Sequence, residues 1–360
     1  MDERFHMTSE SCSRHTDGRP SDHRLQWLIG TLICVLACGC GPSREQTLPP
    51  KAPSTAGAGR QPAAEEVAFE NKEVTQADLQ AWIDDPALRR LRVPGTDLSD
   101  TALSQLASHT KLELLDVTNC ESIGAAGFKA IGQMTSLRHL RVSGTAVTDQ
   151  TAISLSGLTN LAALSLQHTA VTDDGLLLLA SMPKLKELNL YGTPITDASL
   201  ETIAGLPVLQ KLRLRGTGVT GENADAFAKM ANVVDLDLSE TSFVSEGLTS
   251  VSNMPSLRLL NLWLTKVDDK GIAALESQLH LTQLNLDNVS GITDQSLDTI
   301  HKMTDLELLH LGGTSITSAG LPKLHNLKKL KTLFITRLSL APSDVQSLRQ
   351  AMPWITRLES

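Results

Sequence analysis

The chain has 360 residues, of which 41% are hydrophobic but only 3% aromatic, so aliphatic side chains must fill most of any core. Lysine and arginine total 32 against 40 aspartates and glutamates, a formal net charge of −8. This balance disfavours a general nucleic-acid binder, because such proteins usually carry a basic surplus. Four of the five cysteines lie in the first 40 residues, which excludes a disulfide-stapled fold and a cysteine-rich zinc module for the rest of the chain.

The N-terminal region contains one short apolar segment, residues 25–37. A membrane-spanning helix needs about 20 apolar residues, so this segment fits a secretory signal peptide over residues 1–37 better. The sequence VLAC at residues 35–38 resembles the lipobox of bacterial lipoproteins. That resemblance implies lipidation of Cys38, with Cys40 as the alternative, and a protein exported to the cell envelope and held at the membrane by its lipid. Acidic residues upstream of the apolar segment are unusual in a signal peptide, so an uncleaved anchor or an incorrect start codon stays open.

Residues 38–72 are rich in Pro, Ala, Gly and Ser and lack an apolar period, which predicts a flexible tether. Residues 73–87 then predict a helix that caps the following domain. Thr75 and Asp78 have the spacing of a capping box, and Leu79, Trp82 and Ile83 form an apolar stripe at helical spacing. We therefore expect Trp82 in the core.

From residue 88 onward one pattern, LxxLxLxxT, recurs every 24 or 25 residues. Its successive copies start at Leu88, Leu112, Leu137, Leu161, Leu185, Leu209, Val233, Leu257, Leu281, Leu306 and Leu330. The second half of each repeat is also regular, and residues 193–200 read TPITDASL. The pattern resembles the leucine-rich-repeat family, in the GTxITDxGL variant common in bacterial proteins, and is similar to the cysteine-containing subfamily.

The resemblance implies an α/β fold, a right-handed leucine-rich-repeat solenoid over residues 88–360 with about 11 repeats and a partial twelfth. Strands lie about 4.8 Å apart, whereas helices are about 10 Å wide. The stack must therefore bend into an arc with a parallel sheet on its concave face and short helices on its convex face. Cys120 occupies the ninth repeat position and should be buried, and Trp354 and Ile355 should cover the last repeat.

No catalytic motif or metal-ligand spacing is found, so we expect neither an enzyme nor a cofactor. Equivalent positions of several repeats carry an aspartate, and the column comprises Asp100, Asp149, Asp173, Asp197, Asp269 and Asp294. Calcium binding is one hypothesis for this column, but helix capping explains each aspartate. Gly221 and Ser245 replace the aspartate in the sixth and seventh repeats, where the convex side should be looser.

Side chains alternate across a strand, so the third, fifth and seventh positions of each repeat should face the concave side. The candidate partner-binding residues on this face are Tyr191, Arg213, Arg215, Asp235, Asp237, Leu259, Asn261, Trp263, Asp287, His310 and Phe334. Leu308 is expected beside them. The first and third repeats also place Arg90, Arg92, His139 and Arg141 there.

These residues favour a non-enzymatic module whose concave face binds a protein, because exposed Trp, Tyr and Arg anchor interfaces. Glycan binding is the alternative, with Trp263 and Tyr191 stacking on sugars and Asn261, Asn285 and Asp287 binding hydroxyls. It is also open whether the charged rows only satisfy one another across strands. An enzyme using Asp235, Asp237 and Asp287 would need a deep pocket, and a cytosolic ubiquitin-ligase adaptor is at odds with the signal segment.

Overall fold

The computed structural model describes residues 65–70 and 73–360. The predicted signal peptide, both candidate lipidation sites (Cys38 and Cys40) and the first part of the predicted tether lie outside the described residues. Over these two ranges the structure has one 13-stranded parallel sheet, in which strand order follows chain order. The strands are β1 (Glu66–Ala68), β2 (Arg90–Arg92), β3 (Leu114–Asp116), β4 (His139–Arg141), β5 (Ala163–Ser165), β6 (Glu187–Asn189), β7 (Lys211–Arg213), β8 (Asp235–Asp237), β9 (Leu259–Asn261), β10 (Gln283–Asn285), β11 (Leu308–His310), β12 (Thr332–Phe334) and β13 (Arg357–Glu359).

Short helices follow the strands, and several of them are 3₁₀ rather than α. The α-helices are α2 (Gln76–Asp84), α3 (Asp100–Leu106), α4 (Ala125–Gly132), α5 (Asp149–Ala152), α6 (Leu200–Ala204), α7 (Leu248–Val251), α8 (Asp269–Ala274), α9 (Leu297–Ile300) and α10 (Pro342–Ala351). The 3₁₀ helices are η1 (Ile153–Gly157), η2 (Gly175–Ser181), η3 (Asp197–Ser199), η4 (Asp225–Lys229), η5 (Ser245–Gly247), η6 (Leu275–Ser277) and η7 (Leu321–Asn326).

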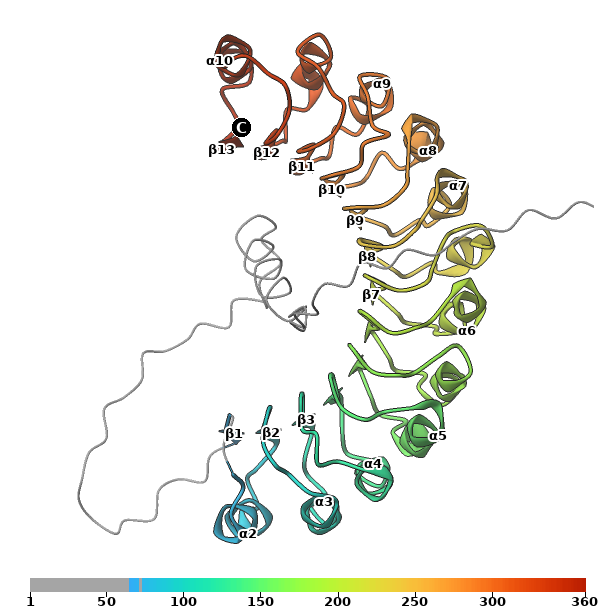
Figure 1. Cartoon of the computed structure of the whole chain (residues 1–360), viewed down its shortest axis with the longest axis vertical. Coiled ribbons are helices and arrows are strands. Elements are labelled where there is room, and N and C mark those ends of the chain that lie inside the picture. The colour runs from blue at the N-terminus through green and yellow to red at the C-terminus, as the bar shows by residue number, and fades with distance from the viewer. Residues whose placement is uncertain (1–64, 71–72) are drawn as a thin grey trace, which may run out of the picture. The chain divides into compact units, whose positions relative to one another are not determined.

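The repeat domain curves into an arc, with the strands along its inner side and the helices along its outer side (Figure 1). The difference in width between strands and helices explains this curvature, as expected from the sequence. The predicted α/β class, with a parallel sheet and short helices, is confirmed.

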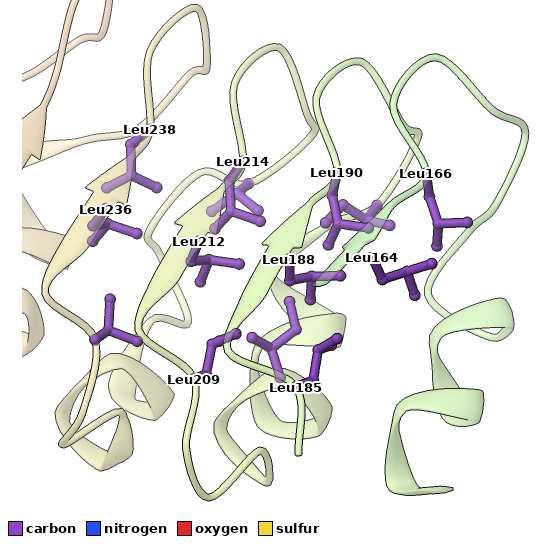
Figure 2. Close-up of a cluster of buried hydrophobic side chains, with 14 of the residues drawn as sticks. Leu164, Leu166, Leu185, Leu188, Leu190, Leu209, Leu212, Leu214, Leu236 and Leu238 are labelled. Carbon is purple, nitrogen blue, oxygen red and sulfur yellow. The ribbon is translucent and has the colours of Figure 1, made fainter. Parts of the chain in front are cut away.

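Stacked leucines fill the space between the sheet and the helices (Figure 2). The register places equivalent residues side by side, so that Leu188 pairs with Leu212 and Leu212 with Leu236. Each of these side chains is buried, which stabilises the fold by about 1.5–3 kcal/mol per leucine. Cys120 is buried in the same core, as predicted, and its thiol donates to the Val93 carbonyl at 3.1 Å.

The eighth residue of each repeat turns the chain out of its strand with a positive φ. In five repeats this residue is glycine, for which the left-handed conformation is inexpensive. The others carry a side chain there, at Asn119, His168, Glu240, Leu264, Asn288 and Arg337. The eighth position therefore places these side chains at the rim of the concave face.

The aspartate column joins neighbouring repeats instead of capping its own helices, which corrects the sequence interpretation. Asp173 accepts from the Thr196 backbone N–H at 2.8 Å and from the Thr196 hydroxyl at 2.7 Å. The capping position precedes the aspartate and is held by residues such as Ser99 and Thr196, whose side chains accept from their own helices. The same pair of bonds joins Asp149 to Thr172, Asp197 to Thr220, Asp269 to Thr293 and Asp294 to Thr317.

The junction between the sixth and seventh repeats is built differently, because Gly221 stands where an aspartate would be. The Val244 N–H donates to the Thr220 carbonyl at 2.8 Å, so a backbone bond replaces the carboxylate bridge. The ring of Phe243 packs against Gly221 and meets Phe227 edge to face at 6.0 Å.

At the N-terminal end the predicted capping helix is confirmed as α2, with the Thr75 and Asp78 capping box present and Trp82 buried. The predicted tether, however, extends too far. Its residues 66–68 form β1, which pairs in parallel with β2, and Phe69 packs edge to face on Trp82 at 5.8 Å. The sequence pattern missed β1 because three residues are too few to show a period. At the other end the indole of Trp354 donates to the Leu327 carbonyl at 2.9 Å.

Candidate functional site

The centre of the concave face holds an arginine between two aromatic rings. Tyr191, Arg215 and Trp263 each occupy the seventh position of their repeat, where the chain leaves the strand. The Arg215 guanidinium carbon lies 4.7 Å from the centroid of the Tyr191 ring and 5.0 Å from that of the Trp263 ring. These three residues, with His168 and Glu240 at the rim, are referred to as the central cluster.

Glu240 and His168 hold the cluster in place. The Glu240 carboxylate accepts two bonds from Arg215, at 2.8 Å from Nε and 2.9 Å from the terminal nitrogen, which fixes the guanidinium plane. The His168 ring meets Tyr191 at 4.4 Å between centroids. Burial and the nearby Arg215 lower the pKa of His168 against the opposing charge of Glu240, so the imidazole is neutral at pH 7.

Trp263 combines a fixed backbone with an unsatisfied side chain. Its N–H donates to the Asn261 side-chain oxygen at 3.1 Å. Its indole Nε1 is buried and finds no hydrogen-bond partner among the described residues, an arrangement that costs about 1–3 kcal/mol. The next residue, Leu264, is 44% exposed with φ +54°. An exposed leucine in this strained conformation contributes nothing to the core.

Two of the predicted contact residues, Arg213 and Asp235, are engaged with each other. Both terminal nitrogens of Arg213 donate to the Asp235 carboxylate, at 2.6 and 2.5 Å. Lys211 likewise donates to Glu187 at 2.7 Å. The alternative in which the charged rows satisfy one another therefore holds on strands β6 to β8.

In several repeats the side chain at the fifth position stabilises the turn after the strand, a role that the sequence did not predict. Asp237, Asn261 and Asn285 each accept from the backbone N–H two residues later, at 3.0, 3.1 and 2.9 Å. Asp237 also accepts from the Ser239 hydroxyl at 2.6 Å. These side chains shape the turn at the end of the strand, as Asx turns do.

Near the C-terminal end the prediction of exposed contact residues is wrong for His310 and Phe334. Each side chain is only 2% exposed. The two rings stack face to face at 4.6 Å, and the Arg357 guanidinium of β13 covers Phe334 at 5.0 Å. Strand alternation gives the direction of a side chain but not how deeply its neighbours cover it.

Asp287 lies beside this stack, and its carboxylate already accepts hydrogen bonds from neighbouring side chains. Arg337 donates to it from two repeats away, and the side-chain amide of Asn288 donates at 3.1 Å. Burial lowers the pKa of the adjacent His310, although the charge of Asp287 opposes that shift. Of the other predicted residues, Leu259 and Asn261 are half-buried on β9, and Leu308 is half-buried on β11.

The rim residues, above all Glu240 and Leu264, were not predicted from the sequence. The signal was present, because glycine fills the eighth position in five of the repeats, at Gly95, Gly144, Gly192, Gly216 and Gly313. The other six repeats carry a side chain at this position, which is held in the left-handed conformation at a cost in strain. Two of these residues, His168 and Leu264, lie next to Tyr191 and Trp263 respectively.

The described residues offer little else that resembles a reactive site. Within residues 65–70 and 73–360 no group of three or more His, Cys, Asp or Glu side chains could hold a metal ion. In the same part of the chain, no helix has the length and apolar character needed to cross a membrane.

Comparison with known proteins agrees with the repeat geometry. Residues 108–132 and 181–204 match a family model described as a leucine-rich repeat. The fold is a leucine-rich-repeat solenoid. A search of curated proteins gave no significant match.

Solved structures of leucine-rich-repeat proteins are similar to this solenoid. An internalin, inlF, from Listeria monocytogenes is 22% identical, with a TM-score of 0.65 over 82% of this chain and 79% of that one. A leucine-rich-repeat protein from Leptospira interrogans is 16% identical, with a TM-score of 0.44 over 79% and 92%. The plant peptide hormone receptor RGFR1, in complex with RGF2, is 15% identical, with a TM-score of 0.45 over 75% and 50%. At this identity the likeness to the internalin establishes the fold alone.

Proposed function

We propose that the protein is a non-enzymatic binding module that holds a protein partner on its concave face, with the central cluster as the main contact. The observation that carries this proposal is the pair of rings, Tyr191 and Trp263, that hold Arg215 in one orientation beside the exposed Leu264. Trp, Tyr and Arg dominate the binding energy of protein interfaces. Side chains that are already ordered lose less entropy when a partner arrives.

The geometry favours a protein over a glycan. A sugar ring stacks on an open aromatic face, whereas the Arg215 guanidinium lies over the rings of both Tyr191 and Trp263. The side-chain oxygens of Asn261 and Asn285, which a glycan would use, accept from the backbone instead. A continuous concave sheet also suits an extended protein surface.

We further propose that the protein belongs to the bacterial GTxITDxGL type and is exported to the cell envelope as a lipoprotein. The apolar segment at residues 25–37 and the sequence VLAC at residues 35–38 support this proposal. Labelling with a fatty-acid analogue should mark the wild type and leave Cys38→Ser unmarked. Loss of the label in Cys40→Ser alone would move the modified residue to Cys40.

Site-specific photo-crosslinking tests the concave face directly. A photoreactive amino acid would replace Leu264 at the rim of the concave face, or Leu177 on the convex side, in cells that produce the protein. Leu177 is a suitable control because it is apolar and 66% exposed on η2. We expect one protein to be crosslinked from position 264 and not from position 177.

The same crosslink should disappear in the double variant Tyr191→Ala, Trp263→Ala. A matched pair of truncations on the convex side, Ile153→Ala with Leu177→Ala, should leave it intact. A crosslink that survives loss of both aromatic side chains, or that forms equally from the convex side, would refute the central cluster as the contact surface.

A further inference from the structure

A second group of polar side chains lies on the concave face, on strands β2 and β4. Arg90, Arg92, His139 and Arg141 are referred to as the N-terminal basic patch. The register aligns Arg90 with His139 across one intervening strand, and Arg92 with Arg141 in the adjacent row. Two strand spacings separate the ends of each row, about 10 Å.

One carboxylate serves both arginines of β2. Glu66 on β1 accepts from Arg92 Nε at 2.8 Å and lies 3.7 Å from Arg90. The Arg90 side chain remains 51% exposed. A guanidinium has five N–H donors, so this single 3.7 Å contact engages only a small part of the hydrogen-bonding capacity of Arg90.

Arg141 has a similarly weak partner. It lies 3.4 Å from Asp116, and its side chain is 55% exposed. The other Asp116 oxygen accepts from the Thr118 hydroxyl at 2.7 Å, so the carboxylate is shared with the turn. In contrast, Glu240 is devoted to Arg215 in the central cluster, with two bonds of 2.9 Å or less.

The charges of the patch therefore do not cancel. Three arginines face two carboxylates, which leaves an excess of one positive charge even with His139 neutral. Burial lowers the pKa of His139, and the charges of Arg141, Arg90 and Arg92 lower it further, while Glu187 on β6 raises it. All three guanidiniums thus act on the imidazole that lies among them.

The opposite half of the concave face differs in character. The third and fifth positions of strands β9 to β12 carry no formal charge at pH 7, since burial keeps His310 neutral. These residues are Leu259, Asn261, Gln283, Asn285, Leu308, His310, Thr332 and Phe334. A chain lying along the arc would thus meet an excess of positive charge at one end and, at the other, strand residues without formal charge beside the paired charges of Asp287 and Arg337.

We propose that the N-terminal basic patch binds the side-chain carboxylates of an acidic, extended segment of the protein partner. This inference rests on the proposed function and adds the chemistry and direction of the partner. Arg90 and Arg141 supply bidentate donors, which match the geometry of a carboxylate. Five strand spacings separate β4 from β9, about 24 Å. The acidic residues therefore lie about seven extended residues from the partner residue that contacts Trp263.

Oligopeptides test the patch without knowledge of the partner. A short oligoglutamate and an oligoglutamine of equal length would be titrated into the full chain by calorimetry at low salt. We expect oligoglutamate to bind and added salt to weaken it. We expect the variant Arg90→Gln, Arg141→Gln to bind about tenfold more weakly, because it loses two charge-assisted contacts.

A charge-matched control is available on the convex side. Lys229 and Lys302 are ion-paired with Glu201 and Glu276, and Lys229→Gln with Lys302→Gln also removes two positive charges. This control should retain oligoglutamate binding. Equal losses in the two double variants, or equal binding of oligoglutamine, would overturn the proposal.

His139 gives a second readout that a change in overall charge would not imitate. Bound carboxylates should raise the pKa of His139, as measured by NMR on histidine-labelled protein with the resonance assigned through His139→Gln. A His139 titration that oligoglutamate leaves unchanged would refute binding at this patch. Inorganic phosphate or anionic vesicles acting in place of the peptide would overturn its assignment to a protein segment.

The crosslinking experiment separates this inference from the proposed function. A crosslink from Leu264 that depends on Tyr191 and Trp263, combined with no oligoglutamate binding, would refute only the basic patch. A crosslink from position 264 that survives the loss of the Tyr191 and Trp263 side chains, or no crosslink from that position when both are present, would refute the central cluster, whatever the peptide does.

Discussion

Removing one inter-repeat aspartate tests how neighbouring repeats are held together. Asp173 accepts from the Thr196 N–H at 2.8 Å, from the Thr196 hydroxyl at 2.7 Å and from the Ser199 hydroxyl. Burial raises the pKa of Asp173, but the bonds from Ser199 and Thr196 outweigh it and hold the pKa below its ordinary value. The bonds therefore favour the ionised carboxylate in the folded state.

The expected loss follows from those three bonds. Hydrogen bonds to a charged group contribute about 1.5–3 kcal/mol each when buried. Asp173 is only half-buried, and water replaces part of what is lost, so about 1 kcal/mol per bond is appropriate. Asp173→Ala should therefore lower the free energy of unfolding by about 2–3 kcal/mol, and Asp173→Asn, which retains one acceptor, by about 1–2 kcal/mol.

Urea unfolding followed by circular dichroism measures this difference. The exposed neighbour Asp174 provides the control, since Asp174→Ala makes the same truncation at the next position and should change stability by less than about 0.5 kcal/mol. If Asp173→Ala is no less stable than Asp174→Ala, the carboxylate does not stabilise the junction and the structural argument is wrong.

Three further predictions concern the same domain. The pKa values of Asp173 and Asp269 are lowered on folding, so the stability they contribute is present above the unfolded pKa of about 3.9 and is lost as pH falls through the folded values. From about pH 5 downward, the free energy of unfolding should therefore fall less steeply in the double variant Asp173→Asn, Asp269→Asn than in the wild type. Parallel curves for the two proteins would contradict this linkage. Gly192→Ala should lower the free energy of unfolding in urea by about 1–3 kcal/mol, because φ is +68° and the added Cβ would lie 2.4 Å from Nδ1 of His168. An unchanged unfolding midpoint would show that the His168 ring moves aside freely. Hydrogen exchange followed by mass spectrometry should be faster around Val244, where no aspartate joins the sixth and seventh repeats, than around Thr220, which Asp197 holds; equal protection would mean that the backbone bond at this junction suffices.

The sequence predicted the core well because the repeat enforces it. Any residue at the first, fourth or sixth position meets its own equivalents in the neighbouring repeats, so Leu188 and Leu212 are buried whatever surrounds them. Its repeat position also predicted the burial of Cys120, and the helical spacing of the apolar stripe predicted that of Trp82. These predictions needed only a period along the chain.

The predictions that failed depended on contacts between residues of different repeats, which the repeat period does not predict. His310 points to the concave side as expected, yet Phe334 and Asp287 cover it. The aspartates were assigned to their own helices because the sequence shows spacing along the chain, whereas each carboxylate reaches the repeat that follows. The central cluster was predicted only in part, since Glu240 stands at the eighth position, which strand alternation does not assign to the concave face.

Strand β1 limits where the chain can be shortened. Its three residues occupy the hydrogen-bonding edge of β2, and the backbone N–H groups of Arg89 and Arg90 donate to the Glu65 carbonyl. A truncation that starts at residue 73 would keep every repeat, yet it would leave that edge open and uncover Trp82 where Phe69 packs. Open edges pair with other chains. Self-association of such a fragment would then reflect the missing strand, and not an assembly of the intact protein.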